Sequence, residues 1–159
     1  MVREFNTVYN QLMISQFGDS YSRINKNKVL KMMDSLNSRY AHTENLFFRE
    51  YIRYRLALLE LSSRVKSRGA IASEYLEGLP ILCYIVEYME FFIQYFSQMH
   101  LTSPNIITSQ ELKETINLGD SYHPLENKLK SLSYLNDPRL RELVVLKGLL
   151  DLYFTGGFD

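Results

Sequence analysis

Tryptophan is absent from this 159-residue chain, and cysteine occurs only once, at Cys83. A single cysteine excludes an intrachain disulfide bond and a Cys-x-x-Cys redox motif. Because Cys83 stands within the apolar segment 81–85, we expect its side chain to be a small buried hydrophobic group rather than a reactive thiol.

Long apolar runs are also missing. No run approaches the roughly 18 residues that a transmembrane helix requires, so we expect no membrane span. The N-terminal residues have the spacing of an amphipathic helix, not a charged stub followed by an unbroken apolar core, and no signal peptide is visible. The residues of this chain therefore do not assign a cellular location.

Basic residues are unevenly distributed, although the chain carries no net charge. Residues 1–68 contain 12 Lys/Arg and 6 Asp/Glu, residues 69–159 contain 6 and 12, and no Lys or Arg occurs between Gly69 and Gln110. The simplest interpretation is that two helical halves of opposite charge pack within one monomer; head-to-tail self-association is an alternative. The zero net charge disfavours a surface for nucleic acid or anionic lipid, and we predict no nucleic-acid partner.

Patterns that carry catalysis or metal binding are not recognisable. His42, His100 and His123 lie far apart, and none has a second His or Cys at ligand spacing. Glu87 and Glu90 share a helix face, as in di-iron bundles, but no Glu-x-x-His pair accompanies them, so we interpret them as a solvated face. A Gly-x-Ser-x-Gly turn and a phosphate-binding glycine loop are absent as well. We therefore assign no catalytic, cofactor-binding or metal-binding residue and expect no enzyme.

What the chain does contain is helical apolar spacing along nearly its whole length. Between Phe47 and Val65, apolar residues fall three or four apart, while Arg49, Arg53, Glu60 and Arg64 mark the opposite, polar face. Strand alternation is not found. The sequence predicts an all-α fold, a bundle or solenoid-like stack of seven to eight helices in antiparallel pairs, in a single domain over residues 1–159.

Capping signals mark where several helices begin. Thr108 and Glu111 have capping-box spacing, in which each side chain accepts a backbone hydrogen bond from the other residue. Asn45 suits the start of the long third helix, and Asp19 or Ser22 could cap the second helix.

The final helix has both a start and a stop signal. Asp137 is a suitable N-cap, and Pro138 follows at the first helical position, where its missing donor costs nothing. Gly156-Gly157 ends the helix. Gly148, in its interior, predicts close approach of a neighbouring helix. Because the sequence stops shortly after this helix, we interpret the chain as a segment of a longer protein.

Aromatic residues are concentrated in one segment. A nucleic-acid platform would interleave aromatic with basic residues on a sheet, whereas this segment is helical and has no Lys or Arg. We therefore expect it to form core or an interface patch. Its members are Tyr84, Tyr88, Phe91, Phe92, Tyr95 and Phe96.

Three stretches, 48–60, 75–96 and 135–154, carry a family resemblance. The second reads Tyr75-Leu-Glu-Gly-Leu-Pro-Ile-Leu-Cys-Tyr-Ile-Val-Glu-Tyr-Met-Glu-Phe-Phe-Ile-Gln-Tyr-Phe96. Together they resemble the helical region that precedes the thioredoxin-like domain in TlpA-like thiol-disulfide oxidoreductases of Bacteroidetes, over about residues 45–159. In that family the chemistry belongs to a Cys-x-x-Cys motif in the following domain, which this chain lacks. The resemblance implies a periplasmic or cell-envelope location and a parent oxidoreductase, and it assigns no catalytic residue here.

Three functional hypotheses follow. The first is a non-catalytic spacer or docking module whose partner is a thioredoxin-like domain in the same parent chain. The second is a free-standing module that binds a protein or peptide through an exposed, tyrosine-rich groove; burial of Tyr84, Tyr88 and Tyr95 would count against it. The third is an unrecognised enzyme, which requires a pocket where a residue such as His100 meets two carboxylates.

Overall fold

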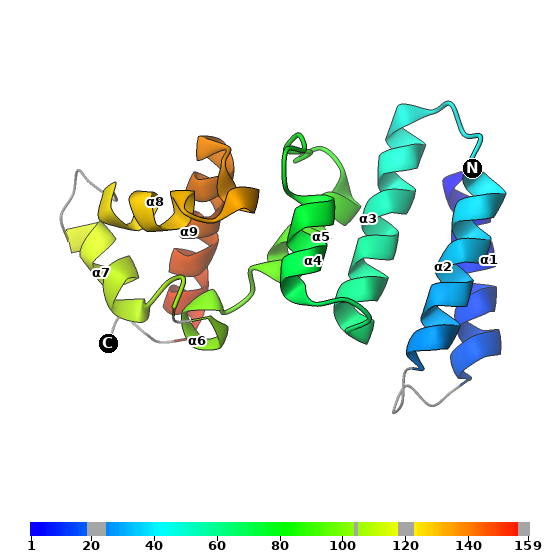
Figure 1. The fold of residues 1–159 in the computed structure, drawn as a ribbon, viewed down its shortest axis with the longest axis horizontal. Helices are drawn as coiled ribbons and strands as arrows, with labels where there is room; N and C mark the ends of the chain where they lie inside the picture. The colour runs from blue at the N-terminus through cyan, green and yellow to red at the C-terminus, as the bar shows by residue number, and fades with distance from the viewer. Residues whose placement is uncertain (19–24, 104, 118–122, 156–159) are drawn as a thin grey trace. The chain divides into compact units, whose positions relative to one another are not determined.

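The structure is a computed structural model that describes residues 1–18, 25–103, 105–117 and 123–155. Within these ranges the chain is helical and forms no β-strand, which confirms the predicted all-α fold (Figure 1). Eight of the described helices have eight or more residues, and α6 is a single turn. The elements are α1 (Val2–Phe17), α2 (Lys26–Tyr40), α3 (Leu46–Ser63), α4 (Arg68–Tyr75), α5 (Val86–Tyr95), α6 (Met99–Thr102), α7 (Ser109–Asn117), α8 (His123–Lys130), the 3-10 helix η1 (Ser133–Leu135) and α9 (Pro138–Phe154).

These elements belong to two compact units. Unit 1 comprises Met1–Ile71 and Leu82–Phe91, and unit 2 comprises Ala72–Ile81 and Phe92–Asp159. The division falls within α4 and α5, each of which contributes residues to both units. The single domain over residues 1–159 stays a prediction.

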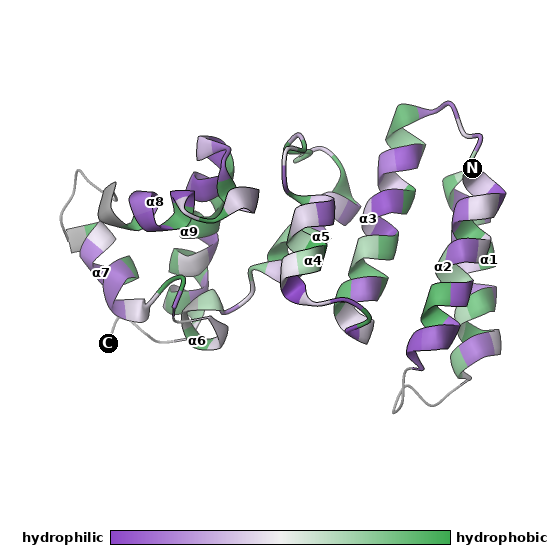
Figure 2. Ribbon diagram, in the orientation of Figure 1, coloured by the Kyte–Doolittle hydropathy of each residue, from purple (hydrophilic) through white to green (hydrophobic). Residues whose placement is uncertain are grey.

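Unit 1 is built on three helices that alternate in direction. The ring of Phe5, near the start of α1, lies 5.4 Å from the ring of Tyr40 at the end of α2 and 6.2 Å from that of Phe48 at the start of α3. At the other end, Lys28 Nζ donates to the carbonyl oxygen of Gln16 over 2.8 Å. Neighbouring helices are therefore antiparallel, as predicted. Figure 2 shows hydrophilic and hydrophobic residues alternating along α2, whose buried residues Val29, Met32, Met33 and Leu36 form one stripe.

The predicted cap of α3 is confirmed, and the cap of α2 is a residue that the sequence analysis did not choose. Phe48 N donates to Asn45 Oδ1 over 2.8 Å at the start of α3. Asp19 and Ser22 lie outside the described residues. The side chain that caps α2 is Asn25, whose Oδ1 accepts from Asn27 N over 2.9 Å.

The sequence predicts that Glu60 lies on an exposed polar face of α3, and this prediction is wrong. Its side chain is fully buried, and one carboxylate oxygen, Oε1, lies 2.7 Å from Lys66 Nζ. The reason is that α3 is covered on more than one side. Residues 56–60 are all buried, and further along unit 1 the ring of Tyr54 lies 4.9 Å from that of Tyr88 on α5. Burial raises the pKa of Tyr54 to about 12.

Unit 2 is organised around α9, which contacts α6, α7, α8 and η1. The close approach predicted at Gly148 is confirmed: a β-carbon built there would lie 3.1 Å from Leu112 Cδ2 on α7. The predicted N-cap is also confirmed, since Arg139 N donates to Asp137 Oδ1 over 2.9 Å and Pro138 follows the cap. The predicted stop signal, Gly156-Gly157, lies outside the described residues.

The capping box at the start of α7 forms as predicted and also reaches α8. Thr108 N donates to Glu111 Oε2 over 2.8 Å, and Glu111 N donates to Thr108 Oγ1 over 3.1 Å. Lys128 Nζ, on α8, donates to Glu111 Oε1 over 2.7 Å. Burial pushes the pKa of Glu111 upward, but the hydrogen bonds from Lys128 and Thr108 outweigh burial and leave this pKa below its ordinary value.

A buried arginine joins three segments of unit 2. Arg141 on α9 is only 4% exposed. Its Nη1 donates to the carbonyl oxygens of Leu135 and Asn136 over 2.7 and 2.9 Å, and its Nη2 donates to Glu126 Oε1 on α8 over 3.1 Å. One guanidinium group therefore satisfies two loop carbonyls and a carboxylate at the same time.

Candidate functional site

Helix α9 exposes a set of large apolar side chains on one side. Positions 146, 150, 153 and 154 fall within a narrow arc of the helix at 3.6 residues per turn, opposite the positions that face the core of unit 2. We call this set the α9 outer face. Its members and their exposed fractions are Leu146 (52%), Leu150 (46%), Tyr153 (67%) and Phe154 (79%).

In the C-terminal half of α9, the polar side chains of Lys147 and Asp151 form hydrogen bonds within unit 2. Asp151 Oδ2 accepts from the backbone N of Gln98 over 2.7 Å, at the start of α6. Lys147 Nζ donates to Asp151 Oδ1, and both side chains are largely buried. Asp151 therefore contacts the start of α6, and neither Lys147 nor Asp151 belongs to the outer face.

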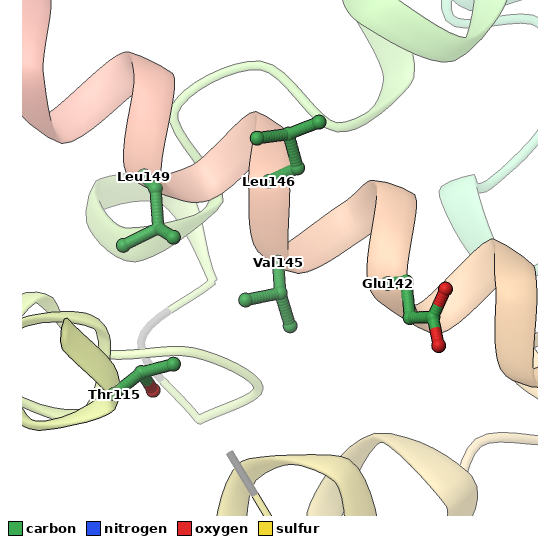
Figure 3. A pocket seen from close by; sticks show the side chains of 5 residues that line it. All are labelled: Thr115, Glu142, Val145, Leu146 and Leu149. Atoms are coloured by element: carbon green, nitrogen blue, oxygen red, sulfur yellow. The ribbon is translucent and has the colours of Figure 1, made fainter. Parts of the chain in front are cut away.

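A small pocket adjoins the outer face. It has a volume of about 210 Å³ and is lined by Leu146, which belongs to the outer face, together with Thr115, Glu142, Val145 and Leu149. Figure 3 shows Val145 and Leu149 pointing from α9 toward the side on which Thr115 of α7 lies. Pockets for drug-sized ligands usually measure about 300–1,000 Å³. A cavity of about 150 Å³ already holds a benzene-sized group, so this pocket fits one large side chain better than a metabolite.

The electrostatic character of the pocket is weakly negative. Glu142 is the only charged side chain among the five that line it. Thr115 belongs to the last turn of α7, where residues 114–117 contain no Lys or Arg. Glu142 is therefore the one carboxylate among the described side chains at the rim of an otherwise apolar pocket.

Sequence reasoning did not find the outer face. The signal available in the sequence was that α9 is apolar nearly all round, with Leu143, Val144, Val145 and Leu146 in succession. Such a helix is normally buried on all sides. Only the contacts that α9 makes in unit 2 show which of its apolar residues stay exposed.

The predicted burial of Cys83 is wrong: its side chain is exposed. Cys83 and Tyr84 are the two central residues of a turn that Ile85 N closes by donating to Leu82 O over 2.9 Å. The turn buries Leu82 and Ile85 at its ends and directs the two residues between them outward. The sequence predicts burial of Cys83 because its neighbours are apolar, which is the pattern of a continuous buried segment.

The aromatic segment is divided between core and surface. Tyr88 and Tyr95 are buried, whereas Tyr84 is 71% exposed. Tyr95 packs within unit 2, with its ring 4.9 Å from that of Phe96. The condition that would count against a tyrosine-rich groove, burial of all three tyrosines, is therefore met for Tyr88 and Tyr95 but not for Tyr84.

Among the residues considered for metal binding or catalysis, those whose side chains the structure describes are not brought together. His42 is exposed in the turn after α2. His100 and His123 stand in α6 and α8, and their side chains lie outside the described residues. Glu90 is exposed, while Glu87 is half-buried near Tyr51. Among the described residues, no three His, Cys, Asp or Glu side chains are arranged to hold a metal ion.

Glu87 influences the Tyr51 phenol. Tyr51 donates to Asn6 Oδ1 over 2.8 Å. Burial raises the pKa of Tyr51, the hydrogen bond with Asn6 opposes that rise, and the negative charge of Glu87 adds to it. A tyrosine whose pKa is raised is a poorer nucleophile and base at neutral pH, so this arrangement is structural in character.

No helix in the described ranges combines the length and the apolar character needed to cross a lipid bilayer. The chain matches no protein-family model, no curated protein sequence and no solved structure.

Proposed function

We propose that this chain is a non-catalytic helical docking module that binds a partner protein through the α9 outer face and the pocket beside it. One observation carries the proposal: Leu146, Leu150, Tyr153 and Phe154 are exposed together on one side of a helix whose other side is packed. Isolated exposed apolar residues are ordinary, but contiguous apolar patches are typical of interaction surfaces.

The chemistry of the pocket supports docking over catalysis. Its five described side chains provide one carboxylate and one hydroxyl group, and no imidazole, thiol or amine. General acid–base or nucleophilic catalysis needs a base within hydrogen-bond reach of the group that it activates. Among the described residues that line the pocket, Glu142 and Thr115 are the only polar pair.

The resemblance to TlpA-like proteins suggests the partner. In this version of the proposal, the module is a spacer or docking platform in the cell envelope, and the outer face contacts a thioredoxin-like domain of the same parent chain. The second version, which shares the same surface, is a free-standing module that binds a separate protein. The exposed fractions on α9 favour both versions equally.

Sequencing the gene on both sides of residues 1–159 separates the two versions. If a thioredoxin-like domain is encoded there, its binding to this chain is measured by calorimetry with the original sequence, with Leu146→Asp and with a matched control, Ile93→Asp. Ile93 is an exposed residue of α5 that belongs to unit 2. We expect Leu146→Asp alone to weaken binding. A gene without such a domain would remove the first version.

A further inference from the structure

The Glu60 carboxylate of unit 1 is removed from water, whereas the lysine that pairs with it reaches the surface. The side chain of Glu60 is 1% exposed and that of Lys66 is 32% exposed, and Glu60 Oε1 lies 2.7 Å from Lys66 Nζ. Among the described residues, Glu60 Oε2 has no hydrogen-bond partner. Lys66 therefore supplies the positive charge that a carboxylate in a protein interior requires.

The segment that carries Lys66 contains a strained residue. Helix α3 ends at Ser63 and α4 begins at Arg68, so residues 64–67 join the two helices. Arg64 has a φ of 52°, in the left-handed region that favours glycine. Such a conformation persists where surrounding contacts hold it. The ion pair between Glu60 and Lys66 is a contact of this kind, because it ties the 64–67 segment back to the helix that the chain has just left.

We propose that Lys66 is a modification site, at which acylation of Nζ releases the 64–67 segment from unit 1. The proposal is independent of the α9 outer face. Acylation converts the ammonium group into a neutral amide, so Glu60 loses its ion-pair partner while it is still inside the protein. A buried carboxylate without a counter-charge is strongly disfavoured relative to one in water. The segment therefore moves so that water reaches Glu60.

The group is transferred from an acyl phosphate, a donor that needs no oxidant or reductant. Nζ of Lys66, in its neutral form, attacks the carbonyl carbon of the donor. A C–N bond forms, the C–O bond to the phosphate breaks, inorganic phosphate leaves, and the proton lost from Nζ goes to water. The reagent can reach Lys66 because about a third of this side chain is exposed.

A second ion pair in the chain provides a matched control. In unit 2, Lys128 Nζ lies 2.7 Å from Glu111 Oε1, and the Lys128 side chain is 34% exposed. The separation and the exposure of the lysine are therefore nearly those of the Lys66 pair, but the Glu111 side chain is 31% exposed. Exposed pairs contribute little, because water solvates a carboxylate that has lost its cation. Neutralising Lys128 should consequently have only a small effect.

The test measures hydrogen exchange at two backbone amides that follow Lys66 in the full chain. Ala70 N donates to Ser67 Oγ over 3.2 Å, and Ile71 N donates to Ser67 O over 3.0 Å. Both amides lose their acceptors when the segment moves. Lys66→Gln replaces the charge by a neutral amide, as acylation does, and Lys66→Arg keeps the charge. Lys128→Gln is the control, with exchange followed at the start of α7.

We expect the amides of Ala70 and Ile71 to exchange about tenfold or more faster in Lys66→Gln than in the original chain. Lys66→Arg, and the start of α7 in Lys128→Gln, should change by about twofold at most. The double variant Glu60→Met with Lys66→Gln should recover the original exchange rates, because the buried charge is removed together with its partner. A merely structural loss of Lys66 contacts would not be recovered by a change at Glu60.

The modification itself is tested by treating the folded original chain and Lys66→Arg with acetyl phosphate. We expect mass spectrometry to locate an acetyl group on Lys66 of the original chain, and this chain to exchange at Ala70 and Ile71 as Lys66→Gln does. Lys66→Arg, which is acetylated at its other lysines only, should keep slow exchange. A folded chain in which Lys66 stays unmodified would overturn the assignment of the site.

The remaining outcomes also decide the matter. Unchanged exchange in Lys66→Gln, or an equal rise at α7 in Lys128→Gln, would show that burial of the carboxylate gives Lys66 no special role. If circular dichroism shows that Lys66→Gln does not fold, the double variant is decisive. A folded double variant with slow exchange supports the proposal, and an unfolded one contradicts it.

Discussion

Gly148 on α9 and Leu112 on α7 are packed as closely as a glycine permits: a β-carbon at position 148 would lie 3.1 Å from Leu112 Cδ2. The Leu112 methyl groups are the far end of a flexible side chain, so alanine is tolerated there with a small displacement. Replacing a glycine inside a helix by alanine stabilises the helix by about 0.5–1 kcal/mol. This gain offsets the cost of displacing Leu112. We predict that Gly148→Ala changes the free energy of unfolding by less than about 1 kcal/mol.

A larger side chain at the same position should separate the helices. Gly148→Leu is expected to destabilise the chain by about 1–3 kcal/mol, the usual cost of overpacking, as measured by urea unfolding. Gly69 on α4 is the matched control because nothing lies within 4 Å of a β-carbon built there, and Gly69→Leu should not destabilise the chain. A Gly148→Leu chain as stable as the original would contradict the close packing of α7 and α9.

Arg141 is predicted to be the most sensitive charged residue of unit 2. Replacing it by methionine keeps most of the side-chain length but leaves the carbonyl groups of Leu135 and Asn136 and the Glu126 carboxylate without their guanidinium partner. Breaking a buried charge pair from one side costs about 3–5 kcal/mol. Because Glu126 is partly exposed, we expect the lower part of this range, about 3 kcal/mol, in chemical denaturation.

The control for this change is another arginine on the same helix. Arg139 pairs with Asp137, but its side chain is 76% exposed, and exposed ion pairs contribute about 0.2–1 kcal/mol. Arg139→Met should therefore cost less than about 1 kcal/mol. Similar losses for both variants would mean that Arg141 does not bridge the three segments.

Glu111 gives the fold a dependence on acidic pH. Its pKa is lowered in the folded chain, because the hydrogen bonds from Lys128 and Thr108 outweigh the opposing effect of burial. The folded state therefore binds the proton less tightly than the unfolded state. The stabilisation that this provides is present above the ordinary pKa of 4.5 and is lost as the pH falls through the lowered pKa of the folded chain.

Glu111→Gln isolates the charge, because glutamine keeps the acceptor of the capping box. At pH 7 the variant should be less stable than the original by about 0.5–1 kcal/mol, and the difference should shrink as the pH falls below about 4.5. Lys128→Met should remove most of that pH dependence. A difference that stays constant from pH 7 to pH 3 would exclude the Glu111–Lys128 pair as its source.

Features decided by neighbouring residues were predictable from the sequence. The capping box at Thr108 and Glu111, the cap at Asn45 and the start of α9 at Asp137 each depend on a side chain that bonds to backbone groups two or three positions away. The role of Gly148 was predictable for a related reason. An unfavourable residue in a helix interior indicates a packing constraint, even though its partner, Leu112, could not be named.

Features decided by tertiary contacts were not predictable. The burial of Glu60 depends on how many elements cover α3, and periodicity along a single helix does not contain that information. The exposure of Cys83 depends on a turn closed between Leu82 and Ile85. The α9 outer face is the same kind of case, since an apolar helix with no polar stripe gives no sign of which side its neighbours leave uncovered.

The central claim, that the α9 outer face is a docking surface for a partner protein, can be tested in the complex with a fluorescent reporter. The chain has no tryptophan, so Leu150→Trp places a single indole group on the outer face, and Tyr84→Trp places one at an exposed site in unit 1. Emission is recorded while the thioredoxin-like domain of the parent chain is added. We predict that the emission of Leu150→Trp shifts to shorter wavelength as the indole leaves water, while that of Tyr84→Trp does not change. A shift confined to Tyr84→Trp, or no shift in either variant, would contradict the claim.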